Sequence, residues 1–140
     1  PGLGAPPVAN GALGGVVARY MVGLRLVTNV APPTLVFDEV DAGIGGTTAL
    51  ALAAALAELG DDHQVLVVTH LPQVAAFADA QVMIDKQVTG ERTATQARPV
   101  DGDERIVELS RMLSGQPDSA TARQHADELL GEAAARRAIR

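Results

Sequence analysis

Two acidic residues and a histidine follow short hydrophobic runs in a pattern that suits phosphate chemistry. Asp38 and Glu39 come directly after the apolar run at residues 34–37. His70 comes directly after a second run at residues 64–69. A carboxylate can hold Mg²⁺, often through water, a second carboxylate can polarise an attacking water, and an imidazole can hydrogen-bond a γ-phosphate. Together these residue types predict a nucleotide-hydrolysis site.

The two apolar runs must be strands for these side chains to meet. Residues 34–37 (TLVF) and 64–69 (QVLVVT) are mainly apolar and do not alternate, which is typical of strands covered on both faces of a parallel sheet. Residues 47–59 between them are good helix formers. The order strand, helix, strand predicts an α/β fold. Because such sheets bind ligands at the carboxyl ends of their strands, we expect the three candidate side chains to lie close together.

The rest of the chain predicts more helices and one hairpin. The helical patterns cover residues 13–29, 71–79, 101–113 and 119–130. Residues 81–88 and 92–100 alternate on either side of a Thr-Gly pair, which predicts an antiparallel hairpin. We therefore expect a Gly/Pro-rich connector at 1–12, an α/β lobe at 13–131 and a frayed tail at 132–140.

Composition narrows the class of protein. The chain has 140 residues, about one domain, and its 11 Lys and Arg against 17 Asp and Glu give a net charge of -6. This balance argues against a dedicated nucleic-acid-binding surface, which is normally basic. The chain has no cysteine, which excludes disulfides and cysteine zinc sites. Its apolar stretches break before the roughly 20 residues of a membrane helix. We expect a cytoplasmic protein with no membrane partner.

Each candidate residue also has a purely structural interpretation. An Asp-Glu pair after a strand is often a helix cap or a solvated turn, and a single histidine after a strand is often structural. Their occurrence together, on consecutive predicted strands, favours a functional site over either interpretation.

The motifs resemble one protein family. The segments TLVFDEVDAGIGG at 34–46 and VLVVTHLPQVAAFAD at 65–79 resemble the carboxyl-terminal ATPase lobe of the RecN family of bacterial DNA repair proteins, which belong to the SMC-like branch of ABC ATPases. The resemblance continues through RMLSGQ at 111–116 and HADELL at 125–130. It implies the carboxyl-terminal lobe of a P-loop NTPase head of the ABC/SMC type, with parallel strands, flanking helices, a terminal β-hairpin and two C-terminal helices.

The resemblance also implies roles for individual residues. Asp38 would be the Walker B aspartate that holds Mg²⁺ through water, and Glu39 the catalytic base. His70 would be the switch histidine that senses the γ-phosphate of ATP. Asp41 with Gly43 would form the D-loop, which crosses the interface of a head-to-head homodimer. ATP and Mg²⁺ are the implied cofactors, and DNA double-strand-break repair and recombination the implied process.

The signature motif departs from the family pattern. The family has a sequence resembling A-S-G-G-E before Walker B, and residues 12–16 here read ALGGV. Gly14 and Gly15 remain and would bring backbone N–H groups to the partner subunit's nucleotide in trans. Leu13 and Val16 replace the serine and the glutamate, which places trans activation in question.

No Walker A motif occurs in this chain. That motif needs a glycine-rich loop ending in a lysine, and the chain's single lysine, Lys86, has no such loop before it. We therefore expect an amino-terminal head half to supply Walker A, and this chain alone not to hydrolyse ATP. The complete protein would contact DNA and associate with the bacterial nucleoid.

Two other functions remain open. The chain could be a degenerate dimerisation module that does not turn over ATP, which Leu13 and Val16 favour and the three retained site residues oppose. It could also be the head of another ABC ATPase, such as a transporter. Transporter heads usually continue from the Walker B glutamate with Pro and T-S-A-L-D, whereas residues 40–43 here read VDAG.

Overall fold

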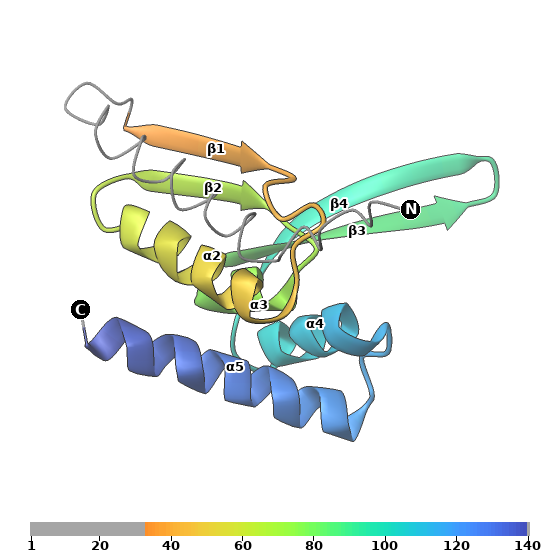
Figure 1. Ribbon diagram of the computed structural model, residues 1–140. Helices are drawn as coiled ribbons and strands as arrows, with labels where there is room; N and C mark the ends of the chain where they lie inside the picture. The colour runs from red at the N-terminus through yellow and green to blue at the C-terminus, as the bar shows by residue number, and fades with distance from the viewer. Residues whose placement is uncertain (1–32, 140) are drawn as a thin grey trace, which may run out of the picture. The chain divides into compact units, whose positions relative to one another are not determined.

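The computed structural model describes residues 33–139, and the chain divides into two compact units between Val74 and Ala75. The predicted helix at 13–29 lies outside the described residues. In chain order the described elements are β1 (Thr34–Asp38), α2 (Gly46–Leu59), β2 (Gln64–Val68), α3 (Pro72–Phe77), β3 (Gln81–Thr89), β4 (Arg92–Val100), α4 (Gly102–Ser114) and α5 (Ala120–Ala138) (Figure 1).

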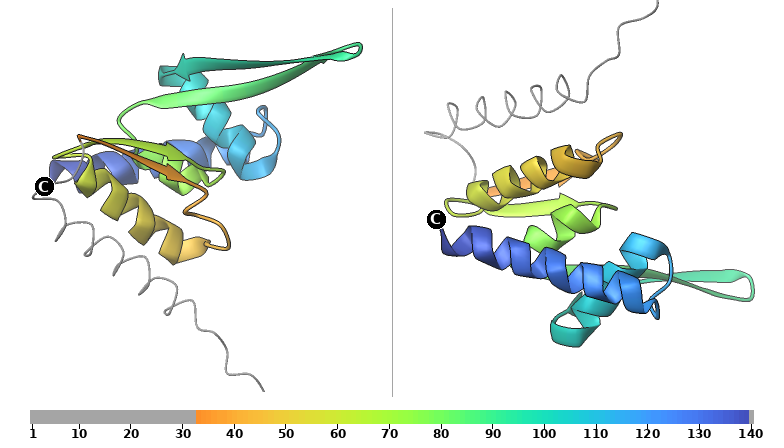
Figure 2. Two further views of the ribbon diagram at one scale, coloured as in Figure 1. Left: turned by 90° about the horizontal axis from the view of Figure 1, so that it is seen from above. Right: turned by 60° about the horizontal axis from the view of Figure 1, so that its bottom comes forward.

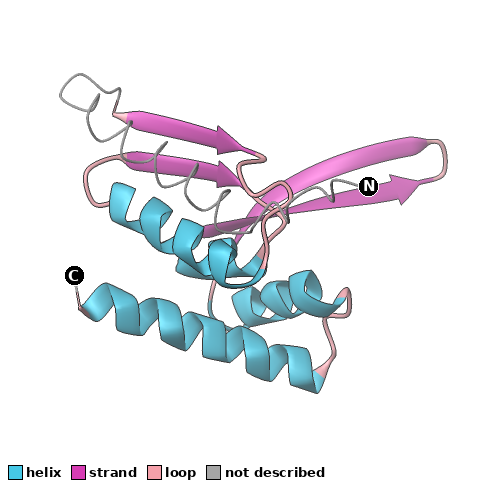
Figure 3. Ribbon diagram, in the orientation of Figure 1, coloured by secondary structure: helices cyan, strands magenta, loops and turns pink. Residues whose placement is uncertain are grey.

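The described part of the first unit is a strand–helix–strand arrangement. β1 and β2 pair in parallel, with Thr34 opposite Gln64 and Asp38 opposite Val68. The parallel pairing and the helix between the strands confirm the sequence prediction. α2 runs along one face of this two-stranded sheet, as Figures 1 and 3 show. The register brings the carboxyl ends of both strands to the same edge.

One stripe of α2 is buried. Its members recur every three or four residues, which places them on one side of a helix: Ala49, Leu52, Ala53, Leu56 and Leu59. Alanine and leucine are also strong helix formers, so propensity and packing favour the same structure here.

The prediction that both strands are covered on both faces is wrong for the described residues. Val36, Leu66 and Val68 are 67%, 50% and 60% exposed, whereas Leu35 and Phe37 are half-buried. Burial alternates because successive side chains of a strand point to opposite faces and α2 covers one of them. The other face is apolar and open.

The second unit contains a long antiparallel hairpin. β3 and β4 pair from Gln81 opposite Val100 to Thr89 opposite Arg92. Gly90 takes a φ of 63° in the turn, a left-handed conformation that glycine adopts at little cost. The predicted hairpin is confirmed, and Figure 3 shows its two strands extending together.

Helices α4 and α5 pack against each other, as both views in Figure 2 show. Leu109 of α4 and Ala126 of α5 are fully buried. Gly115 ends α4 in the left-handed conformation, and the Ser119 hydroxyl accepts the backbone N–H of Ala122 at the start of α5. In α4, Arg111 donates two 2.7 Å hydrogen bonds to the buried Glu108 carboxylate, which raise the pKa of Arg111.

The side chain of Arg105 in α4 caps the carboxyl end of α3. Its Nη2 donates to the carbonyl oxygens of Ala75, Ala76 and Ala78 at 2.9, 3.3 and 2.8 Å, and its Nε donates to Gln81 Oε1 at 3.3 Å. Burial lowers the pKa of the Arg105 guanidinium. The last carbonyls of a helix have no partner within the helix, so this side chain replaces the missing donors.

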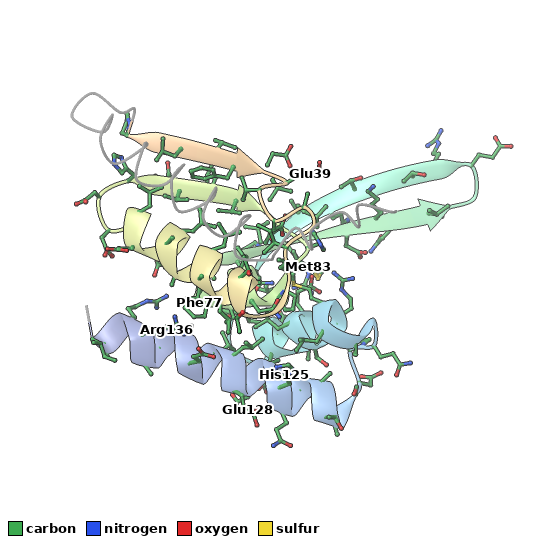
Figure 4. The ribbon with its side chains drawn as sticks, in the orientation of Figure 1. Glu39, Phe77, Met83, His125, Glu128 and Arg136 are labelled. Carbon is green, nitrogen blue, oxygen red and sulfur yellow. The ribbon has the colours of Figure 1, made fainter. Side chains whose placement is uncertain are left out.

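α5 is longer than the sequence predicted. It continues across Gly131 to Ala138, whereas we expected it to end at residue 130 and the tail to fray. Contacts explain the difference: Arg136 lies 5.7 Å from the centre of the Phe77 ring (Figure 4). Arg137 pairs with Asp79 at 3.1 Å and donates to the Phe77 carbonyl at 3.3 Å. These contacts hold the last turns of α5.

Candidate nucleotide site at the sheet edge

The candidate residues lie where β1 and β2 end. Asp38 is the last residue of β1 and faces Val68, the last residue of β2, in the parallel register. Glu39 follows Asp38 directly and lies at the carboxyl end of β1 (Figure 4). His70 comes two residues after β2 ends. The register therefore brings all three to one edge of the sheet, the edge where α/β folds bind ligands.

Glu39 has an unusual backbone. Its φ is +55°, and it is the one non-glycine residue with a positive φ among those that the structure describes. Glutamate in this left-handed region costs on the order of 1–2 kcal/mol, because its Cβ crowds the following carbonyl oxygen. Strained residues of this kind concentrate at functional sites. The strain arises where the chain turns sharply out of β1, and it leaves the Glu39 side chain exposed.

Asp41 is the acidic residue that reaches His70. Its side chain is 1% exposed. Its Oδ2 accepts one hydrogen bond from the Thr69 hydroxyl and another from the His70 backbone N–H, the latter at 3.2 Å. The same oxygen lies 3.4 Å from His70 Nδ1. Within residues 33–139, no hydrogen bond or ion pair joins His70 to Asp38 or Glu39. One carboxylate thus ties the loop after β1 to the end of β2.

The loop that carries Asp41 is itself held in place. The Ala42 N–H donates to the Glu39 carbonyl at 3.2 Å, and the Ile44 N–H donates to the Asp41 carbonyl at 3.0 Å. The Ile44 side chain is buried. These bonds form a compact turn, so the position of Asp41 is set by backbone as well as by side-chain contacts.

Sequence reasoning missed Thr69. Its hydroxyl donates to Asp41 and accepts the Leu71 N–H at 3.0 Å, so it uses both hydrogen-bonding capacities. The sequence feature that could have indicated a role for Thr69 is its position directly before His70, at the end of a predicted strand. A hydroxyl at a strand end commonly bonds to nearby backbone groups, but the sequence does not reveal that Asp41 is its other partner.

The glycines of the loop serve its turn. Gly43 has a φ of 72° and Gly46 a φ of 58°, conformations that side chains rarely adopt. Gly45 precedes α2 as its N-cap, without a side-chain cap. The predicted signature residues Gly14 and Gly15, like Leu13 and Val16, lie outside the described residues.

The described residues contain neither a cluster of metal-binding side chains nor a membrane-spanning helix. In residues 33–139, no three histidine, aspartate or glutamate side chains are placed to hold a metal ion together. None of the helices described there is long and apolar enough to cross a membrane.

Similar proteins were found by sequence. No protein-family model matches the chain. It is 51% identical to the DNA repair protein RecN of Streptomyces coelicolor over 98% of this chain and 24% of that protein. RecN of Deinococcus radiodurans is 48% identical over 93% of this chain and 23% of the relative. RecN of Vibrio cholerae is 41% identical over 93% of this chain and 24% of that protein.

The match lies in the carboxyl-terminal part of those relatives, and the chain spans about a quarter of their length. A solved structure from work on ATP-driven dimerisation and DNA-stimulated activation of SMC ATPases shares the fold. Its TM-score is 0.59 at 16% identity, over 77% of this chain and 63% of that one. The predicted α/β fold is confirmed, because the chain shares it with that SMC ATPase structure.

Proposed function

Because this chain is a RecN-type sequence that corresponds to the carboxyl-terminal part of its relatives, we propose that it forms part of an ATP-binding and ATP-hydrolysing head. The complete protein would act in DNA double-strand-break repair and recombination in the bacterial cytoplasm. The observation that carries this proposal is the edge of the β1–β2 sheet. The parallel register brings Asp38, Glu39 and His70 to that edge, and the buried Asp41 carboxylate accepts hydrogen bonds from the Thr69 hydroxyl and the His70 backbone N–H.

Each residue at this edge has a task in the proposed reaction. Asp38 is exposed at the end of β1, and its oxygens suit Mg²⁺, which favours oxygen ligands and retains water. Because no second and third acidic or histidine ligands converge in the described residues, water and phosphate oxygens would complete the coordination shell. Bound Mg²⁺ would neutralise charge on the phosphates.

Glu39 and His70 would act on the two reactants. The Glu39 carboxylate would orient the attacking water and accept its proton. The His70 ring, whose side chain is 71% exposed, would donate a hydrogen bond to a γ-phosphate oxygen. Both side chains stand at the solvent side of the edge, where a nucleotide can approach.

We propose two partners for this lobe. The first is an amino-terminal head half that supplies the Walker A lysine, because the chain's single lysine, Lys86, lies in β3. The open apolar face of β1 and β2 supports a covering partner, since large exposed apolar patches mark interaction sites. The second is another head in a homodimer, to which Gly14 and Gly15 would contribute in trans and the Asp41–Gly43 loop would form part of the interface.

A non-catalytic dimerisation module is the second candidate function. Leu13 and Val16 favour it, because they replace the hydroxyl and the carboxylate of the signature motif. The head of another ABC ATPase, such as a transporter, has less support, because the chain is 41–51% identical to RecN proteins of three bacteria.

The test is ATP turnover by the complete protein, with and without DNA. We expect Glu39→Gln to lower kcat by roughly 100-fold or more, because the proton acceptor is lost, while ATP binding persists. Glu91→Gln, in the exposed hairpin turn, is the matched control and should turn over ATP normally. This chain alone should show no turnover. A folded Glu39→Gln protein with full activity would instead support the non-catalytic module.

A further inference from the structure

Asp41 contacts Thr69 and His70 of its own chain, which its proposed place at a subunit interface does not explain. It is almost fully buried, and a single oxygen, Oδ2, meets the Thr69 hydroxyl, the His70 backbone N–H and the His70 ring. A buried carboxylate is costly unless hydrogen bonds compensate for lost water. The groups that compensate here all belong to His70 or to the residue before it.

The cluster holds the backbone of His70 and places its ring beside the Asp41 carboxylate. The backbone is fixed because Thr69 bridges Asp41 and the Leu71 N–H, while Asp41 also accepts the His70 N–H. The ring lies beside the same carboxylate, with Nδ1 3.4 Å from Asp41 Oδ2. An ionised carboxylate at that position can accept a hydrogen bond from an Nδ1–H group but has no hydrogen to donate to Nδ1. The Nδ1–H form of the ring is therefore the one that matches this site.

We propose that Asp41 is a positioning residue for His70: it holds the ring with Nδ1 protonated and directs Nε2 toward solvent and ligand. A hydrogen bond from one ring nitrogen sets the role of the other. With a phosphate oxygen at Nε2, the ring would carry protons on both nitrogens and lie between two anionic groups. The ligand contact rests on the proposed function, whereas the position of the ring does not.

The first experiment measures the ring directly. Long-range ¹H–¹⁵N spectra of the 140-residue chain distinguish the two neutral histidine tautomers at alkaline pH. Exposed His125 serves as the internal reference, because an unconstrained neutral ring favours the Nε2–H form. We expect His70 to show the Nδ1–H pattern in the wild-type chain and to change to the His125 pattern in Asp41→Ala. Amide spectra report whether the variant folds.

Asp38→Ala is the matched control, because Asp38 is the same residue type at the same sheet edge and does not bond to His70. It should leave the His70 tautomer unchanged. If Asp41→Ala does not fold, the wild-type spectrum still decides: an Nε2–H ring at His70 would overturn the proposal. The same conclusion follows if a folded Asp41→Ala variant retains the Nδ1–H form.

The second experiment uses ATP turnover by the complete protein. Asp41→Ala should lower kcat roughly 10- to 100-fold, the usual effect of a misplaced reacting group, and leave KM within about twofold. A raised KM with unchanged kcat would contradict the positioning role. If Glu39→Gln retains full turnover, the proposed function fails while the tautomer result still stands, so the two failures are distinguishable.

Discussion

Glu39 combines a carboxylate at the sheet edge with a backbone conformation that side chains rarely adopt. Its φ is +55°, and it lies between the end of β1 at Asp38 and Asp41, whose carboxylate contacts His70. The sequence placed Glu39 at the end of a strand, but it gave no sign of this conformation. Left-handed residues are usually glycine or asparagine, so pattern reasoning has no reason to expect one at a glutamate.

The backbone of Glu39 leads to a stability prediction. We expect Glu39→Gly to be more stable than Glu39→Ala by about 1 kcal/mol, because glycine adopts positive φ without a steric penalty. Both variants lose the carboxylate, so the comparison isolates the backbone. Urea unfolding of the two chains measures the difference. Equal stability, or a more stable alanine variant, would show that position 39 is not strained.

Asp41 illustrates a different limit of sequence reasoning. The sequence predicts that His70 lies close to Asp38 and Glu39, and that placement stays a prediction. The acidic residue that the structure bonds to His70 is Asp41. The ends of β1 and β2 determine at which edge of the sheet the candidate residues lie. The path of the loop after β1 determines which carboxylate is buried, and here it is that of Asp41. That path depends on the Ile44 and Ala42 backbone bonds, which have no sequence signature.

At the scale of elements, local patterns were most informative. The β1, α2, β2 order and the hairpin follow from periodicity and turn residues, and the structure confirms them. The length of α5 does not follow, because Arg136 and Arg137 gain their partners from Phe77 and Asp79, far away in the sequence. Local composition alone predicted an unstable tail.

The cap on α3 can be tested by removing it. Arg105→Ala leaves the carbonyls of Ala75, Ala76 and Ala78 without this donor, and we expect the free energy of unfolding to fall by about 2 kcal/mol. Arg98→Ala is the control: it removes an exposed arginine paired with Glu104 at 2.8 Å, worth about 1 kcal/mol or less. Denaturant unfolding followed by circular dichroism compares them. Similar losses would mean that Arg105 is no more than another surface arginine.

At the scale of the whole molecule, one face of the β1–β2 sheet exposes the apolar side chains of Val36, Leu66 and Val68. Continuous apolar strands predicted cover on both faces, and the described residues provide it on one. The prediction from strand composition describes what these side chains favour, namely burial. It does not specify which polypeptide supplies the cover, because burial of apolar surface is not directional.

This face should govern how the chain associates. We expect the double variant Val36→Thr, Val68→Thr to self-associate less than the wild-type chain in sedimentation experiments, because it removes exposed apolar surface. Its free energy of unfolding should change by less than about 1 kcal/mol. Val67→Thr, on the half-buried side, is the control and should lower stability instead. Unchanged association of the double variant would rule out this face as the contact.

The place of Lys86 has a practical consequence. It is the sole lysine of the chain, and it stands exposed in β3, opposite Thr95 in the hairpin. A reagent selective for side-chain amines would therefore attach a single fluorophore to this chain at a known point on the hairpin. Such a dye would report on the hairpin in its native sequence, without a cysteine being introduced and without a change to any residue at the sheet edge.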